Sequence, residues 1–100
     1  MRAFLSRERI MNKVVITVVG KDTVGILARV CSYLAENGIN VCDITQTIVQ
    51  GYFNMMMIVD TAKATKPFAV TGAELSKLGL EMGLHIRCQK AEIFEKMHRI

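Results

Sequence analysis

Tryptophan is absent from this chain, proline occurs once, and the 100 residues include only two histidines and three cysteines. The cysteines Cys31, Cys42 and Cys88 are odd in number and widely spaced, and no Cys-x-x-Cys pair occurs. This excludes a disulfide framework and the usual redox and metal-chaperone motifs. Cysteines in apolar contexts of this kind behave as small buried hydrophobic residues in a reducing cytosol, so we expect a cytoplasmic protein.

Long apolar runs and a basic stripe are also missing. No run approaches the roughly 20 apolar residues that span a bilayer. The net charge of +4 falls to +2 without residues 1–10, because ten Lys and Arg then face eight Asp and Glu. Residues 1–10 also lack the apolar stretch and cleavage site of a signal peptide. We expect a mobile N-terminal extension over residues 1–12, one domain over 13–94 and a tail over 95–100, with neither a membrane nor a nucleic acid as partner.

Catalytic groups are scarce as well. Neither His85 nor His98 has a carboxylate or a cysteine at the spacing of a metal site, and isolated histidines are mostly structural. Asp22, Asp43 and Asp60 fall at expected strand ends or in loops, where aspartate commonly stabilises turns. The sequence therefore predicts no enzyme, no cofactor and no metal.

Hydrophobic periodicity in the first half predicts a strand followed by a helix. Residues 13–19 are nearly all Val and Ile, which is typical of a central strand covered on both faces. The helix is expected to be capped by Asp22 or Thr23 and to end at Asn37-Gly38. Its apolar stripe, spaced i, i+3, i+4 and i+7, comprises Leu27, Val30, Cys31 and Leu34.

Two further strands are expected next. The second covers residues 39–50, with a bulge where polar residues interrupt its alternation. A tight turn at Gln50-Gly51 then leads into a third strand over residues 52–60. The inward positions of this third strand are Phe53, Met55, Met57 and Val59, and the outward ones are Tyr52, Asn54, Met56 and Ile58.

The last part of the chain predicts a second helix and a final strand. Pro67 is expected in the first turn of the helix, Gly72 and Gly79 weaken its apolar face, and Gly83 ends it. The strand is expected over residues 84–94. The order strand, helix, strand, strand, helix, strand predicts an α+β sandwich of ferredoxin-like type, a four-stranded antiparallel sheet with two helices on one face. The stripe of the second helix comprises Phe68, Leu75, Leu78 and Met82.

The sheet face away from the helices is expected to be apolar. Tyr52, Met56 and Ile58 point to it, and exposed apolar surface commonly marks a protein interface. The chain can therefore be an interaction or dimerisation module without a ligand. An RNA-binding module of the same topology is a weaker alternative, because no basic residue precedes Gly51 and the first strand has no aromatic ring for base stacking.

The turn between the first strand and the first helix is the best candidate for a binding site. A helix N-terminus leaves its first N–H groups without partners and carries partial positive charge, which suits a carboxylate or a phosphate. Gly25 lets a ligand approach the backbone closely. The turn lacks the Gly-Lys-Ser/Thr ending of a phosphate-binding loop. The alternative is a purely structural turn, since such a turn occurs at every strand–helix junction.

Three local patterns resemble the ACT domain family, in particular small stand-alone members related to the glycine-cleavage-system transcriptional repressor. They are TVVGKDTVGIL at residues 17–27, ENGINV at residues 36–41, and Asp-Ile followed by Gln-Thr at residues 43–47. The resemblance covers residues 13–94. It implies the ferredoxin-like fold and a homodimer, often formed edge to edge, with a small amino acid bound at the interface.

The resemblance also implies the site residues. Asp22 stands where amino-acid-binding members have Asn or Asp, Gly25 is the small residue that admits the ligand, and Asn40 matches a ligand-contacting Asn. Gly20 stands where some serine-binding members hold a His. The sequence thus predicts a non-enzymatic regulatory protein, a homodimeric amino-acid sensor that acts on a separate protein partner. The expected ligand-binding residues are Asp22, Thr23, Val24, Gly25, Ile26 and Asn40.

Overall fold

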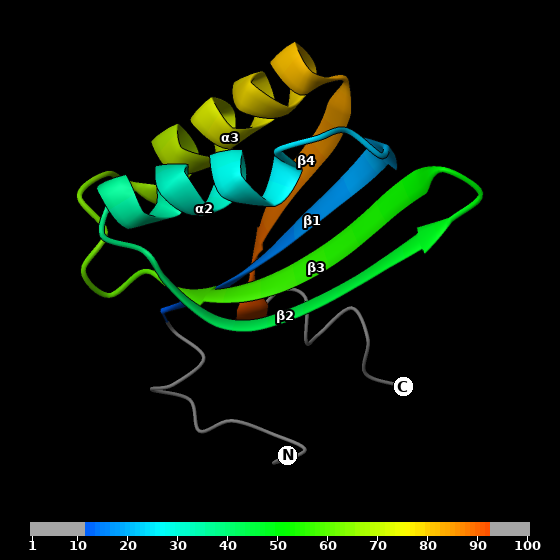
Figure 1. The fold of residues 1–100 in the computed structure, drawn as a ribbon. Helices are drawn as coiled ribbons and strands as arrows, with labels where there is room; N and C mark the ends of the chain where they lie inside the picture. Colours follow the sequence, from blue (N-terminus) through cyan, green and yellow to red (C-terminus); the bar gives the residue numbers. More distant parts are fainter. Residues whose placement is uncertain (1–11, 93–100) are drawn as a thin grey trace.

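The computed structural model describes residues 12–92, which form an antiparallel sheet in the order β2-β3-β1-β4 with both helices on one face (Figure 1). This is the predicted ferredoxin-like arrangement. The expected extension and tail lie outside the described residues, apart from Asn12, and those boundaries stay predictions. The elements are β1 (Lys13–Lys21), α2 (Ile26–Glu36), β2 (Asn40–Val49), β3 (Tyr52–Asp60), α3 (Phe68–Met82) and β4 (Leu84–Lys90).

The core lies between the sheet and the helices and follows the period-two alternation of the strands. Met55 and Met57 are 3% and 0% exposed, whereas Met56, on the other face, is 40% exposed. Alternation within β3 is therefore as predicted, because successive side chains of a strand point to opposite faces. The other strands supply Val14, Ile16, Val18, Leu84 and Ile86 to the same core.

Helix α2 buries a different line of residues from the one predicted. Ile26, Val30 and Leu34 are buried, whereas Leu27 is 40% exposed and Cys31 is half-buried. Residues spaced by four fall on nearly the same side of a helix, and Leu27 is turned about 100° away from Ile26. Val30 and Leu34 of the predicted stripe therefore face the core, whereas Leu27 lies on the flank of the helix, on the side of the edge strand β2.

The cysteines also differ from expectation. Cys31 and Cys88 are half-buried free thiols, but Cys42 is exposed. Cys42 lies between Val41 and Asp43, where the register of β2 against β3 shifts by one residue, so the predicted bulge is confirmed. The extra residue of a bulge has no partner across the ladder, which leaves the Cys42 side chain at the sheet edge rather than in the core.

Strand β4 is shorter than expected. It ends at Lys90, and Ala91 and Glu92 are helical, while residues 93 and 94 lie outside the described part. Lys90 pairs with Val14, next to the first residue of β1. Beyond this point β1 offers no further backbone groups for pairing, so the ladder stops there.

Helix α3 packs closely against the sheet at Gly79. A Cβ atom added to Gly79 would lie 2.7 Å from Ile86 Cγ1 and 3.1 Å from the Leu84 carbonyl oxygen. Gly79 therefore allows close packing of α3 on β4 instead of merely weakening the helix. At Gly72 the same added atom would be 3.9 Å from Cys88 Cβ, an ordinary contact. The two glycines of one helix thus face different surroundings.

We expect opposite effects from alanine at these two positions. Gly79→Ala should destabilise the domain by about 1–3 kcal/mol through overpacking, whereas Gly72→Ala should stabilise it by up to about 1 kcal/mol through helix propensity. Urea denaturation of both variants measures the two free energies. Equal changes of the same sign would show that α3 does not approach β4 at Gly79.

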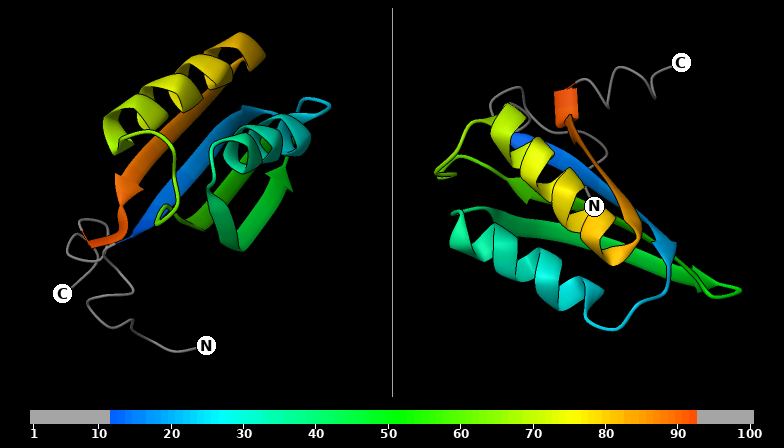
Figure 2. Two further views of the ribbon diagram at one scale, coloured as in Figure 1. Left: turned by 90° about the vertical axis from the view of Figure 1, so that its left-hand side faces the viewer. Right: turned by 90° about the horizontal axis from the view of Figure 1, so that it is seen from above.

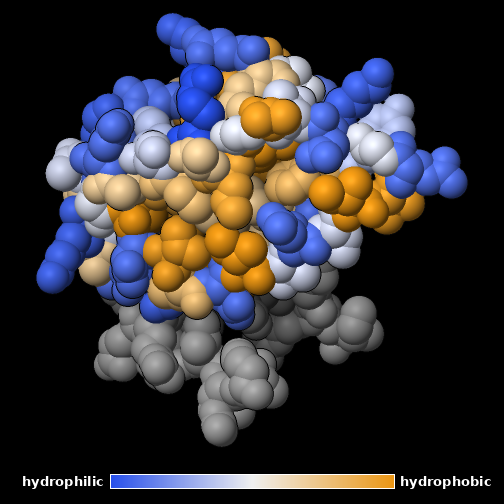
Figure 3. Space-filling model, viewed as in Figure 1, coloured by the Kyte–Doolittle hydropathy of each residue, from blue (hydrophilic) through white to orange (hydrophobic). Residues whose placement is uncertain are grey.

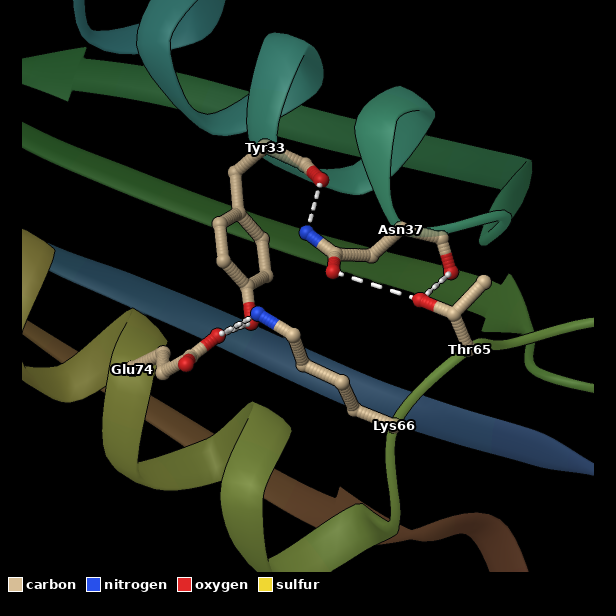
Figure 4. A network of polar contacts seen from close by, with 5 residues as sticks. All are labelled: Tyr33, Asn37, Thr65, Lys66 and Glu74. Atoms are coloured by element: carbon tan, nitrogen blue, oxygen red, sulfur yellow. Dashed lines mark hydrogen bonds and ion pairs between the residues drawn. The ribbon is translucent and has the colours of Figure 1, made fainter.

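A polar network ties the two helices and the loop of residues 61–67 together (Figure 4). The Tyr33 hydroxyl donates to Glu74 Oε1 at 2.5 Å, and Lys66 Nζ lies 2.8 Å from the same oxygen. Asn37 Nδ2 donates to the Tyr33 carbonyl at 2.8 Å, and the Thr65 N–H donates to the Asn37 carbonyl at 3.0 Å. The network fixes the loop against the C-terminal end of α2.

The network makes stability depend on alkaline pH. Burial and the hydrogen bond to Glu74 raise the pKa of Tyr33 from 10.0 to about 12. The neutral phenol is favoured in the folded state, so its contribution is complete below pH 10 and is lost as the pH rises toward 12. We expect the thermal midpoint to fall more steeply over this range in the wild type than in Tyr33→Phe. Parallel curves, followed by circular dichroism, would contradict the assignment.

Candidate functional site

The β1–α2 turn, residues 22–25, is exposed throughout. Val24 at its tip is 99% exposed. The Asp22 N–H donates to the Gly51 carbonyl at 2.9 Å, which joins the turn to the β2–β3 hairpin. The turn therefore lies at the end of the sheet where β2 ends and β3 begins.

The expected helix cap is wrong. Neither Asp22 nor Thr23 caps α2; Gly25 occupies the N-cap position with φ +87°, and no side chain bonds to the first turn. Instead, the Thr23 hydroxyl donates to the Lys21 carbonyl at 3.1 Å. A left-handed Gly25 starts the helix at Ile26, one turn later than a cap at Asp22 requires.

Backbone donors remain available at this turn. The Ile26 N–H lies 3.4 Å from the Thr23 carbonyl, and the Arg29 N–H donates to Gly25 at 2.9 Å. Within residues 12–92, the N–H groups of Thr23, Val24 and Gly25 have no acceptor. Together with the partial positive charge of the helix N-terminus, these donors favour a carboxylate group at the turn.

Asn40 lies at the opposite end of the sheet. It pairs with Asp60, which in turn pairs with Lys13 at the start of β1, whereas the turn follows Lys21 at the end of β1. The nine residues of β1 separate the two positions by about 25–30 Å. Asp22 and Asn40 of one chain therefore do not contact the same small molecule.

A polar hollow of about 390 Å³ surrounds Asn40. Its other lining residues are Gly38, Asp60, Ala62 and Lys63. Asp60 accepts the Ala62 N–H through Oδ1 at 2.8 Å and pairs with Lys13 through Oδ2 at 3.5 Å. Sequence reasoning missed Asp60 and Lys63; the only signal was an aspartate at the end of a predicted strand.

The predicted interface residues lie together on the sheet face opposite the helices. Tyr52 and Met56 are exposed there, and Ile58 is half-buried; their alternation places all three on this face, which Figure 2 shows without either helix. A hollow of about 200 Å³ adjoins them. Its lining includes Thr17, Val19, Thr45, Thr47, Asn54 and Met56. Whether another protein covers this face stays a prediction.

A second exposed apolar group was not predicted. Ile44 and Ile48 of β2 point to the helix side of the sheet, opposite the buried Met57 and Phe53, yet Ile48 is 56% exposed. Leu27 on the flank of α2 is also exposed. Figure 3 shows hydrophobic atoms gathered below the helices on this side of the molecule. We call Leu27, Ile44 and Ile48 the β2-edge patch; β2 itself has no neighbouring strand on its outer side among the described residues.

Comparison with known proteins identifies the family. A model of the ACT domain matches residues 12–89. The chain belongs to the ACT domain family. The family predicted from the sequence is thus confirmed.

Individual relatives agree with this assignment. The chain is 62% identical over 90 residues to a UPF0237 protein of Bifidobacterium longum. The aligned region covers 90% of this chain and all of the relative. An ACT domain protein from Streptococcus pneumoniae superimposes with a TM-score of 0.73 and 41% identity, over 83% of this chain and 93% of that one. A structure described as a glycine cleavage system transcriptional repressor matches with a TM-score of 0.64 and 25% identity, over 77% of this chain and 44% of that one.

The described residues of this ACT domain meet the requirements of neither a metal centre nor a membrane-spanning helix. Across residues 12–92, no three His, Cys, Asp or Glu side chains gather closely enough to hold a metal ion. In the same part of the chain, no helix combines the length and apolarity needed to cross a membrane. Two separate groups of polar atoms remain as candidate binding sites. We call the amides of the β1–α2 turn and the hollow at Asn40 the two half-sites.

Proposed function

We propose that this ACT domain is a non-enzymatic, cytoplasmic regulatory protein whose homodimer binds a small amino acid and acts on a separate protein partner. The observation that carries the proposal is the position of the two half-sites at opposite ends of the free edge strand β2. The β1–α2 turn lies at its Val49 end, since Val49 and Lys21 both pair with Tyr52. Asn40 begins the strand.

A two-fold axis beside β2, perpendicular to the sheet, would complete the site. Two copies of an edge strand related by such an axis run antiparallel, so the first residue of one lies beside the last residue of the other. Pairing of two β2 strands therefore brings the turn of one copy next to Asn40 of its partner. The same pairing covers the β2-edge patch and satisfies the open backbone groups of the edge.

The chemistry of the composite site fits a free amino acid. The amides at Val24 and Gly25 suit its carboxylate, and the carboxylate of Asp22 suits its ammonium group. The Asn40 side chain supplies both a donor and an acceptor. Both charges of the small molecule are thus met by the β1–α2 turn of one copy, and Asn40 of the other copy supplies further hydrogen bonds.

A thermal-unfolding screen of the twenty amino acids tests the proposal. An amino acid present at about 100 times its dissociation constant should add about 2.7 kcal/mol to the free energy of unfolding. Asp22→Ala and Asn40→Ala should each weaken binding at least about tenfold, since each removes a hydrogen bond to a charged group. Glu81→Ala, which removes an exposed carboxylate on α3, away from β2, is the matched control. Stabilisation by none of the amino acids at millimolar concentration would overturn the proposal.

The exposed face around Met56 favours a second candidate, an interaction module that needs no ligand. In that case Met56→Lys and Ile58→Lys should abolish self-association, while the amino-acid screen stays negative. Analytical ultracentrifugation separates the two candidates, because the sensor keeps its dimer when these residues are changed and loses it when the β2-edge patch is changed.

A further inference from the structure

A second cavity lies away from the β1–α2 turn but adjoins the hollow at Asn40, since its lining residues Ile39, Val59 and Thr61 are chain neighbours of Asn40 and Asp60. It has a volume of about 150 Å³ and sits between the sheet, the start of α3 and the loop of residues 61–67. It shares no lining residue with the hollow at Asn40 or with the β1–α2 turn. Strands β1, β3 and β4 all contribute to its walls, so it belongs to the core of one chain and does not need a second copy.

The cavity has an apolar floor and one polar end. Val14, Ile16 and Val59 form the floor and are each at most 5% exposed. The polar part of the lining comes from Thr61, the buried Thr71 and the Lys66 side chain, which is partly exposed. An occupant therefore needs a hydrocarbon body at the floor and one polar atom toward Lys66.

The charge at the polar end is already balanced. Lys66 Nζ lies 2.8 Å from Glu74 Oε1, so a second carboxylate would be repelled by Glu74. The ammonium group has three donors, and its hydrogen bond to Glu74 uses one of them. A neutral acceptor, such as a carbonyl oxygen, can take another donor without disturbing the ion pair.

The loop of residues 61–67 is held over the cavity by hydrogen bonds at both of its ends. Thr65 holds it through its N–H to the Asn37 carbonyl, at 3.0 Å, and Lys66 holds it through Glu74. Both contacts lie on the helix side of the loop, as Figure 4 shows, whereas the Thr61 N–H holds the start of the loop to the Asn12 carbonyl, at 2.8 Å, beside the β1–β3 ladder. Breaking these contacts gives a small molecule a route inward while the strands stay paired.

We propose that this cavity binds one small neutral molecule with a branched hydrocarbon body and a single hydrogen-bond acceptor. A cavity of this volume holds about as many atoms as a benzene molecule. The hydrocarbon branches contact the floor, and the acceptor atom receives a hydrogen bond from Lys66. This cavity shares no lining residue with the proposed amino-acid site and needs no second copy.

The test uses two probes of nearly identical shape, methyl isopropyl ketone and isobutyrate, which differ in charge. We expect the ketone at millimolar concentration to shift the methyl NMR signals of Ile16, Ile39 and Val59 in a saturable way. The signals of Ile44 and Ile48 should not move, and isobutyrate should give no saturable shift. Failure of the ketone to bind, or equal shifts with isobutyrate, would overturn the proposal.

Variants that fill the cavity give the matched control. Ala64→Leu places a larger side chain in the cavity and should abolish the ketone shifts, whereas Ala73→Leu, on the exposed side of α3, should leave them unchanged. If Ala64→Leu does not fold, Cys88→Leu fills the cavity from β4 instead. Shifts that persist in a folded filled variant would place the ketone elsewhere and contradict the proposal.

Discussion

Gly38→Ala is expected to destabilise the domain by about 3 kcal/mol or more. Gly38 follows α2 with φ +72°, a left-handed conformation that costs alanine about 1–2 kcal/mol. In addition, a Cβ atom there would overlap the backbone carbonyl of Lys63. A backbone carbonyl cannot rotate away as a side chain can, so the loop of residues 61–67 would have to move.

Gly51→Ala separates the cost of the left-handed backbone conformation from the cost of the overlap with the Lys63 carbonyl. Gly51 has φ +82°, but an added Cβ atom meets nothing within 4 Å. Its replacement should therefore cost only the conformational term, about 1–2 kcal/mol. Urea denaturation of the two variants gives the difference directly. Equal losses would mean that the loop does not press against the end of α2.

Ile48→Lys is expected to dissociate the proposed β2–β2 dimer. In that arrangement Asn40 of one copy lies beside Val49 of the other, so the substitution places a charge against the first residues of the partner strand in both copies. We expect the dimer dissociation constant to rise by about a hundredfold, which corresponds to nearly 3 kcal/mol. Because Ile48 is 56% exposed in the single chain, the monomer itself should lose little stability.

Leu80→Lys is the control for this variant. Leu80 is also an exposed apolar residue, but it lies on α3, away from β2. Sedimentation equilibrium should show an unchanged dimer for Leu80→Lys and a monomer for Ile48→Lys at the same concentration. Dissociation by Leu80→Lys, with Ile48→Lys still dimeric, would place the interface on the helices instead.

Local patterns in the sequence were sufficient for most of the fold. Gln50 and Gly51 both have positive φ, as the predicted tight turn requires, and Met55 and Met57 are buried because alternation fixes their side of the strand. The phase of α2 was not predictable, because Leu27 and Ile26 are both apolar. Only the left-handed Gly25 and the position of the sheet decide which of the two faces the core.

The β1–α2 turn was predictable from the local sequence, but its distance from Asn40 was not. A turn with free amides after β1 follows from the local sequence around Gly25. The distance between Asp22 and Asn40 is instead set by strand pairing over the whole length of β1, which a local pattern does not encode. The β2-edge patch was not predictable for a similar reason. The apolar side chains of Ile44 and Ile48 are typical of core residues, and only the structure shows that α2 leaves them uncovered.

The central claim is that each amino-acid site is formed by two copies of the chain. Asp22→Ala and Asn40→Ala, folded together, test it most directly by calorimetric titration with the amino acid that stabilises the wild type. Neither variant alone should bind it well, but mixed dimers contain one intact site, so about a quarter of all sites should recover wild-type affinity. A mixture that binds no better than the separate variants would contradict a shared site.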